Sequence, residues 1–138
     1  MATVSLLSDE EASAEARAVF EEIRAARCTD YVNNFWRAMA HDPATLRATW
    51  DRLRDVMAPG ALDPLVKELL YVAVSVTNGC DYCIHSHTAA ARAKGMTPEQ
   101  YGELLAVIGM AAQTNQLVTA MKVPVDEMFL VGETGGEK

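Results

Sequence analysis

Three helix-start signals divide the chain, and they constrain its fold more than any other feature. In each of them a residue whose side chain can cap a helix is followed by proline: Asp42-Pro43, Asp63-Pro64 and Thr97-Pro98. Proline is tolerated in the first helical turn because the amide that it lacks has no partner within the helix. Apolar residues recur at helical spacing before and between these pairs. The pattern therefore predicts an all-α helical bundle of about six to seven helices.

Capping and stop signals predict further boundaries. Ser8 and Glu11 have the spacing of a capping box, in which each side chain binds the other residue's backbone amide, so a helix is expected from there to about residue 26. A second helix is expected over residues 31–40. Asn78-Gly79 and Gly95 end the helices that precede them, because both residue types tolerate the left-handed conformation.

Length and composition indicate one folded domain. The chain has 138 residues, of which 50% are hydrophobic and 22% are charged, and these values are not typical of a disordered protein. We expect a single domain over residues 1–131, followed by a flexible C-terminal tail over residues 132–138.

No run reaches the roughly 18 apolar residues of a membrane span. Residues 104–121 are expected to form one helix or two, with Gly109 as the weak point.

The charge of the chain limits the classes of partner. A net charge of −7 argues against nucleic acid and against anionic lipid, because both bind clustered Lys and Arg. The N-terminus has no basic segment and soon becomes acidic, which is not typical of a signal peptide. Three cysteines, an odd number, do not suit a disulfide framework. We therefore expect a cytoplasmic protein that binds neither nucleic acid nor membrane.

Cys80 and Cys83 form a Cys-x-x-Cys pair at the start of a predicted helix. The two intervening residues bring both sulfur atoms to the same side of the first turn, where a disulfide can close with little strain. The N-terminal end of a helix carries about half a positive charge and free amides, and both stabilise a thiolate. One or both cysteines are therefore expected to titrate below the value of a free thiol, about 8.5.

His87 and Glu68 are predicted to lie beside this pair. His87 follows Cys83 by four residues, so its imidazole lies one turn farther along the same face, as a candidate base or proton relay. Glu68 precedes the turn at Gly79 by about eleven residues, and His87 follows it by about eight. If the two helices fold back antiparallel, both side chains lie within about one turn of the same level. Glu68 could then orient or charge the imidazole, through one water where needed, and Ser75 falls on the same face as Glu68.

This set of residues resembles the alkylhydroperoxidase D-like branch of the carboxymuconolactone decarboxylase superfamily. The specific part is Glu-x11-Cys-x2-Cys-x3-His, and the resemblance covers roughly residues 33–126. It implies that Cys83 is the peroxide-reactive cysteine, which becomes a sulfenic acid. It also implies that Cys80 resolves the sulfenic acid to a disulfide. Glu68 and His87 would form the proton relay.

The resemblance further implies a thiol-dependent peroxidase, or disulfide oxidoreductase, that reduces hydroperoxides. A thiol reductant, such as a dihydrolipoyl group or a thioredoxin-like protein, would reset the pair. The subunits would form a homo-oligomer, since the family forms trimers or hexamers. The best-known peroxidase members carry a histidine at the position of Tyr82. The sequence has neither a GxGxxG motif nor a P-loop, and no flavin, haem or nucleotide cofactor is expected.

Three other interpretations stay open. One is a structural or regulatory zinc site, for which four residues are ligands by type: Cys80, Cys83, His85 and His87. On one helix, however, His85 points roughly opposite to His87. Another is a carboxymuconolactone decarboxylase-like enzyme acting on a small organic acid or lactone, although that branch typically lacks the cysteine pair. The third is a redox sensor or structural oligomer whose disulfide forms without peroxide turnover.

The remaining distinctive residues have structural interpretations. Cys28 has no partner in the sequence and is expected to pack as a small hydrophobic residue. Trp36 and Trp50 are expected in the core or at a subunit interface rather than at a cofactor. His85 is expected at the surface, or at the mouth of the site as a second proton donor.

Overall fold

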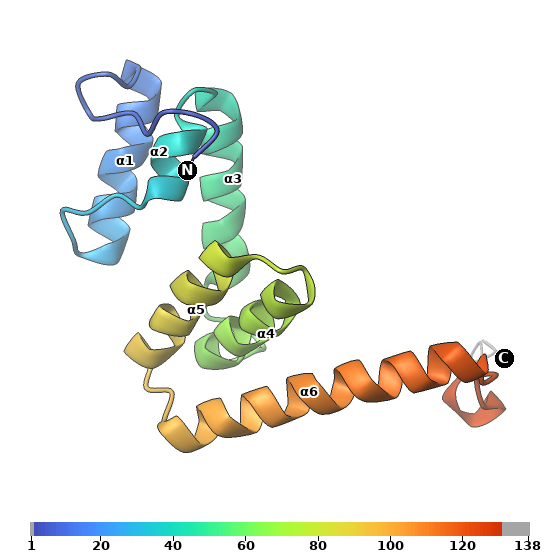
Figure 1. Cartoon of the computed structure of the whole chain (residues 1–138). Coiled ribbons are helices and arrows are strands. Elements are labelled where there is room, and N and C mark those ends of the chain that lie inside the picture. The colour runs from blue at the N-terminus through green and yellow to red at the C-terminus, as the bar shows by residue number, and fades with distance from the viewer. Residues whose placement is uncertain (1, 131–138) are drawn as a thin grey trace, which may run out of the picture. The chain divides into compact units, whose positions relative to one another are not determined.

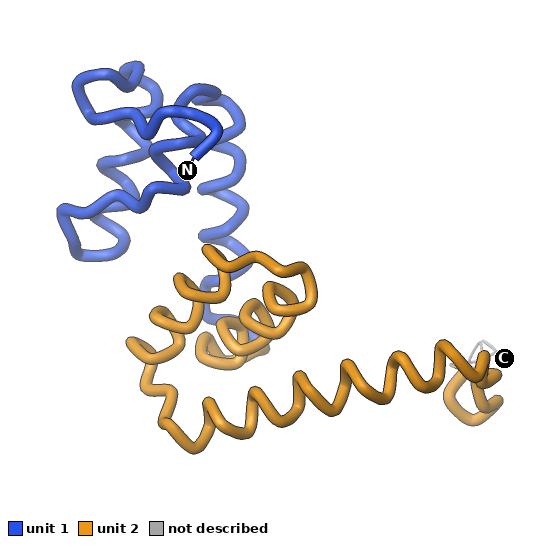
Figure 2. Tube along the Cα trace, in the orientation of Figure 1, with its two compact units in different colours: residues 1–61 blue, residues 62–138 orange. Residues whose placement is uncertain are grey.

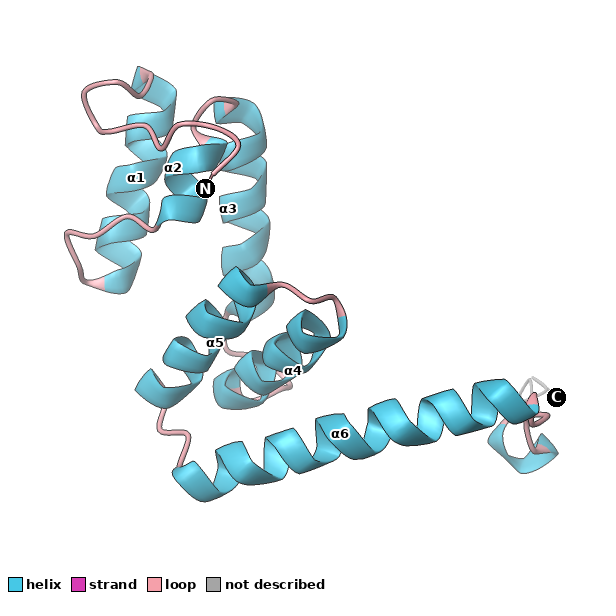
Figure 3. Cartoon of the chain, viewed as in Figure 1, coloured by secondary structure: helices cyan, strands magenta, loops and turns pink. Residues whose placement is uncertain are grey.

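A computed structural model describes residues 2–130, which form helices joined by short loops (Figures 1 and 3). The α-helices are α1 (Ala14–Arg27), α2 (Asn34–Met39), α3 (Pro43–Met57), α4 (Pro64–Thr77), α5 (Asp81–Ala93) and α6 (Pro98–Met121), and a 3₁₀ helix covers Glu127–Phe129. No strand is present within this described part of the chain. The predicted all-α fold is therefore confirmed.

The chain divides into two compact units, residues 1–61 and residues 62–138 (Figure 2). The first unit contains α1 to α3, and the second contains α4 to α6 and the 3₁₀ helix. The single domain expected over residues 1–131 stays a prediction. The tail expected over residues 132–138 lies outside the described residues.

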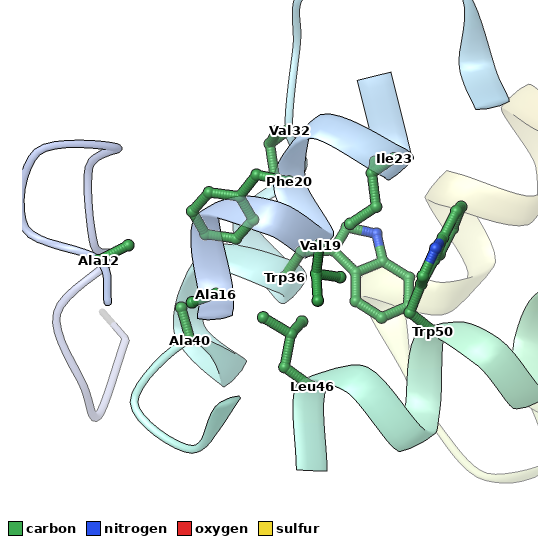
Figure 4. Close-up of a cluster of buried hydrophobic side chains, with 10 residues drawn as sticks. All are labelled: Ala12, Ala16, Val19, Phe20, Ile23, Val32, Trp36, Ala40, Leu46 and Trp50. Atoms are coloured by element: carbon green, nitrogen blue, oxygen red, sulfur yellow. The ribbon is translucent and has the colours of Figure 1, made fainter. Parts of the chain in front are cut away.

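The first unit is stabilised by one hydrophobic cluster (Figure 4). Apolar residues recur along α1 every three or four positions, so one side of this helix is buried. The cluster comprises Ala12, Ala16, Val19, Phe20, Ile23, Val32, Trp36, Ala40, Leu46 and Trp50. The rings of Trp36 and Trp50 meet edge to face with their centroids 5.5 Å apart. Both tryptophans therefore belong to the core of this unit.

The helix boundaries predicted from proline and glycine are confirmed. The side chains of Asp42, Asp63 and Thr97 each accept a hydrogen bond from a backbone amide in the first turn of the helix that follows. Gly79 and Gly95 follow the ends of α4 and α5 with φ of +63° and +92°. These left-handed conformations are accessible to glycine without strain, and they let the chain leave each helix in a tight turn.

Three details of the first unit differ from the sequence prediction. The helix expected over residues 31–40 is shorter and covers Asn34–Met39. Ser8 and Glu11 make the reciprocal bonds of the capping box, but they close an isolated turn, and α1 begins only at Ala14 with Ser13 as its cap. Cys28 is exposed rather than packed. It is the residue after α1 and has φ of +50°, so the chain turns out of the helix there and carries the side chain away from the buried stripe.

In the second unit, α6 is a single helix of 24 residues that continues through Gly109, and it has no buried residue. By length and composition alone it is apolar enough to cross a membrane, whereas the sequence analysis expected no such segment. A single helix of this kind is weak evidence for a membrane span. Four consecutive polar residues, 113–116, also interrupt its apolar sequence.

Candidate active site

The helices α4 and α5 carry the predicted site residues and form a hairpin in the second unit (Figure 1). The turn between them is short: the backbone amide of Cys80 donates to the carbonyl of Ser75, 3.0 Å away, and Gly79 reverses the chain between them. This reversal brings α5 back along α4. Glu68 and His87 therefore lie at the same level, as counting residues from Gly79 predicted.

The imidazole of His87 contacts the carboxylate of Glu68 directly. His87 Nδ1 lies 2.7 Å from Glu68 Oε2, so no bridging water is needed. The side chain of Glu68 is only 5% exposed and that of His87 is 17% exposed. A carboxylate buried to this degree must be balanced by donors or positive charge. This contact therefore constrains how α4 and α5 pack against each other.

Lys94 is a third member of this cluster, and the sequence analysis did not identify it. Its Nζ atom lies 2.9 Å from Glu68 Oε1, so each oxygen of the carboxylate has its own partner. Burial alone would raise the pKa of Glu68, but hydrogen bonds from His87 and Lys94, together with the charge of Lys94, hold the pKa below its ordinary value. Glu68 is therefore ionised at neutral pH. The missed signal was the spacing of seven between His87 and Lys94, which returns a side chain to the same face.

Tyr71 covers one face of the His87 ring. The two ring centroids are 3.5 Å apart and the planes differ by 17°, which is a stacked arrangement. Burial, followed by the negative charges of Cys83, Cys80 and Glu68, raises the pKa of Tyr71. The phenol therefore keeps its proton at neutral pH. Sequence reasoning missed this residue because a tyrosine in an apolar helix is more often a packing residue than a site residue.

The two cysteines lie at the start of α5. Cys80 is the cap residue, and its sulfur accepts a hydrogen bond from the backbone amide of Cys83 at 3.3 Å. A hydrogen bond with the Cys80 sulfur, then burial and the negative charge of Cys80, raise the pKa of Cys83 to about 11. The lowered pKa expected for a cysteine at a helix start is therefore not found at Cys83. The neighbouring sulfur stabilises the Cys83 proton more than the helix end favours its loss.

Other polar residues of the region have different surroundings. His85 is exposed. Ser75 is buried, and its hydroxyl donates to the carbonyl of Tyr71 at 2.7 Å within α4.

Between residues 2 and 130, no group of three or more His, Cys, Asp and Glu side chains is placed to hold a metal ion. The zinc interpretation therefore gains no support from the structure.

Comparison with known proteins assigns the family. Residues 43–126, more than half of the chain, match the carboxymuconolactone decarboxylase family. The chain belongs to this family. The crystal structure of the alkylhydroperoxidase AhpD core from Rhodospirillum rubrum matches it with a TM-score of 0.91 and 63% sequence identity, over 95% of this chain and 98% of that one. The predicted resemblance to the AhpD-like branch is therefore confirmed.

Longer relatives carry the AhpD name as well. Alkyl hydroperoxide reductase AhpD of Maricaulis maris is 33% identical over 119 residues, which are 80% of this chain and 65% of that protein. The AhpD of Solibacter usitatus is 38% identical over 76 residues, 54% of this chain and 41% of that protein. An uncharacterised protein of Cupriavidus necator is 35% identical over 81 residues, 59% of this chain and 72% of that protein. The chain thus spans less than two thirds of the length of these AhpD relatives.

Proposed function

We propose that this member of the carboxymuconolactone decarboxylase family is a thiol-dependent peroxidase, an antioxidant oxidoreductase that reduces hydroperoxides through Cys80 and Cys83. Glu68 and His87 serve as its proton relay. The observation that carries the proposal is the buried Glu68–His87 contact, which joins the two helices that meet at the cysteine pair. The names of the AhpD relatives support the same class of reaction.

The relay has a defined task because Cys83 holds its proton. With a pKa of about 11, Cys83 is almost entirely a thiol at neutral pH, so a base must remove the proton as the reaction begins. His87 follows Cys83 by one helical turn, and the proposal assigns it to accept this proton, directly or through one water. The ionised Glu68 stabilises the imidazolium that forms.

The reaction then proceeds in two covalent steps. The Cys83 thiolate attacks the terminal oxygen of the hydroperoxide, an S–O bond forms as the O–O bond breaks, and the alkoxide takes the proton from His87 and leaves as an alcohol. Cys80 then loses its proton as its sulfur attacks the sulfur of the sulfenic acid, an S–S bond forms as the S–O bond breaks, and the leaving hydroxide gains that proton and departs as water. An external dithiol, of the dihydrolipoyl or thioredoxin-like class, supplies two electrons and two protons to reopen the disulfide.

Single-cysteine variants test the proposal in a Cys28→Ser background, which removes the exposed third thiol. After one equivalent of an organic hydroperoxide, the parent should show a Cys80–Cys83 disulfide by peptide mass mapping. Cys80→Ser should accumulate a sulfenic acid on Cys83 that dimedone traps, and Cys83→Ser should consume no peroxide. A sulfenic acid on Cys80 in the Cys83→Ser protein would reverse the two roles.

Two other outcomes would replace the proposed activity. A disulfide that forms once, with no turnover in the presence of any dithiol, would identify a redox sensor. Turnover of a small lactone or organic acid by the Cys80/Cys83 double variant at the parent rate would identify a decarboxylase-like enzyme. The peroxidase proposal requires both that the dithiol sustains turnover and that the double variant is inactive.

We also propose that the protein is cytoplasmic and that further copies of the chain cover α6 in a trimer or hexamer. The support for the oligomer is the exposed apolar surface of α6, on which Val107, Met110 and Met121 are 60–65% exposed. Light scattering after gel filtration should show the oligomer, and the double variant Val107→Glu/Met110→Glu should shift it to a smaller species. Sedimentation of the wild-type protein with lipid vesicles would instead support a membrane partner.

A further inference from the structure

Lys94 is the remaining charged group of the cluster that the proposed relay does not use. It follows α5 as the cap residue, and its backbone amide donates to the carbonyls of Ala90 and Ala91 at 3.1 Å. Gly95, with φ of +92°, turns the chain immediately afterwards. The backbone thus fixes the position of Lys94, two turns beyond His87, and its ammonium reaches back to Glu68 Oε1. A substitution of the side chain leaves these backbone bonds intact.

The charges of the cluster decide which form of His87 is favoured. Glu68 and Lys94 together are neutral, so a neutral imidazole leaves the cluster without net charge. An imidazolium would give it a charge of +1, and uncompensated charge on a ring that is only 17% exposed is costly. Without Lys94 the imidazolium form of His87 becomes the favoured one, because it would then be the group that neutralises the Glu68 carboxylate.

The other titratable groups around the ring do not alter this balance at rest. From α4, Tyr71 stacks on the imidazole and stays a neutral phenol, because burial and the nearby negative charges raise its pKa. On α5, Cys83 is protonated at neutral pH. The negative charge that faces His87 most closely is therefore that of Glu68, 2.7 Å from Nδ1.

We propose that Lys94 is a positioning residue that neutralises Glu68 and so keeps His87 as the neutral Nδ1–H imidazole, with the lone pair on Nε2 available as a base. In this form Nδ1–H donates to Glu68, and Nε2 can accept the proton of Cys83. An imidazolium has protons on both nitrogens and cannot act as a base. The expected change in the rate of peroxide consumption rests on the proposed peroxidase function. The expected change in the protonation of the His87 ring does not.

The test compares three substitutions of Lys94 with one control. Lys94→Met removes the charge and the hydrogen bond, Lys94→Gln keeps a donor without charge, and Lys94→Arg keeps both. Arg92→Met is the matched control, because it removes one positive charge from an exposed side chain two residues away on α5, where Arg92 lies over the Tyr101 ring. The imidazole ¹⁵N chemical shifts of His87, which distinguish the neutral tautomers from the imidazolium, are measured from pH 5 to pH 9.

The neutral Nδ1–H form should persist at pH 7 in the parent, Lys94→Arg and Arg92→Met. In Lys94→Met and Lys94→Gln the share of imidazolium at pH 7 should rise, and peroxide consumption should fall there by up to about fivefold and recover at higher pH. A parent-like ¹⁵N pattern and pH profile in both uncharged variants would overturn the inference. Since the ¹⁵N readout needs no turnover, it tests Lys94 even if the parent consumes no peroxide, a result that would overturn the proposed function alone. If one uncharged variant fails to fold, the other still gives the result.

Discussion

The charge of Glu68 should stabilise the α4–α5 hairpin, and Glu68→Gln isolates that charge because the side chain keeps its size. At neutral pH the variant loses two charge-assisted hydrogen bonds, from His87 at 2.7 Å and from Lys94 at 2.9 Å. A hydrogen bond to a charged group contributes about 1.5–3 kcal/mol. Lys94 is 38% exposed, so its bond is discounted to below about 1 kcal/mol, and glutamine retains part of the other. We expect a net loss of about 2 kcal/mol in the free energy of unfolding.

This loss should depend on pH in one direction. The pKa of Glu68 in the folded protein lies below its ordinary value of 4.5, so the ionised carboxylate stabilises the fold above that pH. The contribution disappears as the pH falls through the folded value, because the protonated acid resembles the amide of glutamine. The difference between wild type and Glu68→Gln should therefore be full at pH 7 and should shrink steadily below about pH 4.

Urea unfolding followed by circular dichroism measures this difference at pH 7 and at pH 3. Glu103→Gln on α6 is a matched control, since Glu103 is exposed, and it should change the free energy of unfolding by less than about 0.5 kcal/mol at both pH values. The comparison of each variant with wild type at the same pH cancels the titration of all other carboxylates. A Glu68→Gln difference that is equal at both pH values, or absent at pH 7, would refute a stabilising role for the ionised carboxylate.

Three further predictions concern the thiols, the core and a turn. Cys80→Ser removes the neighbouring sulfur and should lower the pKa of Cys83 from about 11. The pH dependence of Cys83 alkylation measures this pKa, and an unchanged profile would contradict the effect of the Cys80 sulfur on Cys83. Phe20→Ala empties a fully buried position and should cost about 3–5 kcal/mol in urea unfolding, whereas a cost below about 1 kcal/mol would show that the cluster is loosely packed. Gly79→Ala, at φ of +63°, should destabilise the protein by about 1–2 kcal/mol, whereas Gly102→Ala inside α6 should stabilise it by about 0.5–1 kcal/mol.

Local rules predicted the helices because their signals act within a few residues. A capping side chain followed by proline marks a helix start whatever packs on the helix later, and Asp42 and Asp63 behave in this way. The capping box at Ser8 shows the limit of such rules, since its bonds form but the helix does not continue from them. Whether a first turn extends into a helix depends on tertiary packing, which the motif does not encode.

The Glu68–His87 contact was predictable because both residues could be counted from one turn. A hairpin of two straight helices has a fixed rise per residue, so position along the sequence converts into height along the helix. Lys94 and Tyr71 were not predictable in the same way. Lysine has a long side chain whose direction depends on where a buried negative charge lies, and Tyr71 required knowledge of which face of α4 meets the imidazole.

The thiol pair shows why a helix end alone does not set the acidity of a cysteine. A helix start offers about half a positive charge, spread over several amides, to any thiolate near it. Cys80 is the cap residue, and its sulfur accepts a hydrogen bond from the backbone amide of Cys83. A hydrogen bond with the Cys80 sulfur, then burial and the negative charge of Cys80, raise the pKa of Cys83 to about 11, so together they outweigh the half charge of the helix start and Cys83 keeps its proton at neutral pH. In the proposed mechanism Cys83 therefore needs a base to remove its proton, and this is the role that we propose for His87, assisted by Glu68 and Lys94.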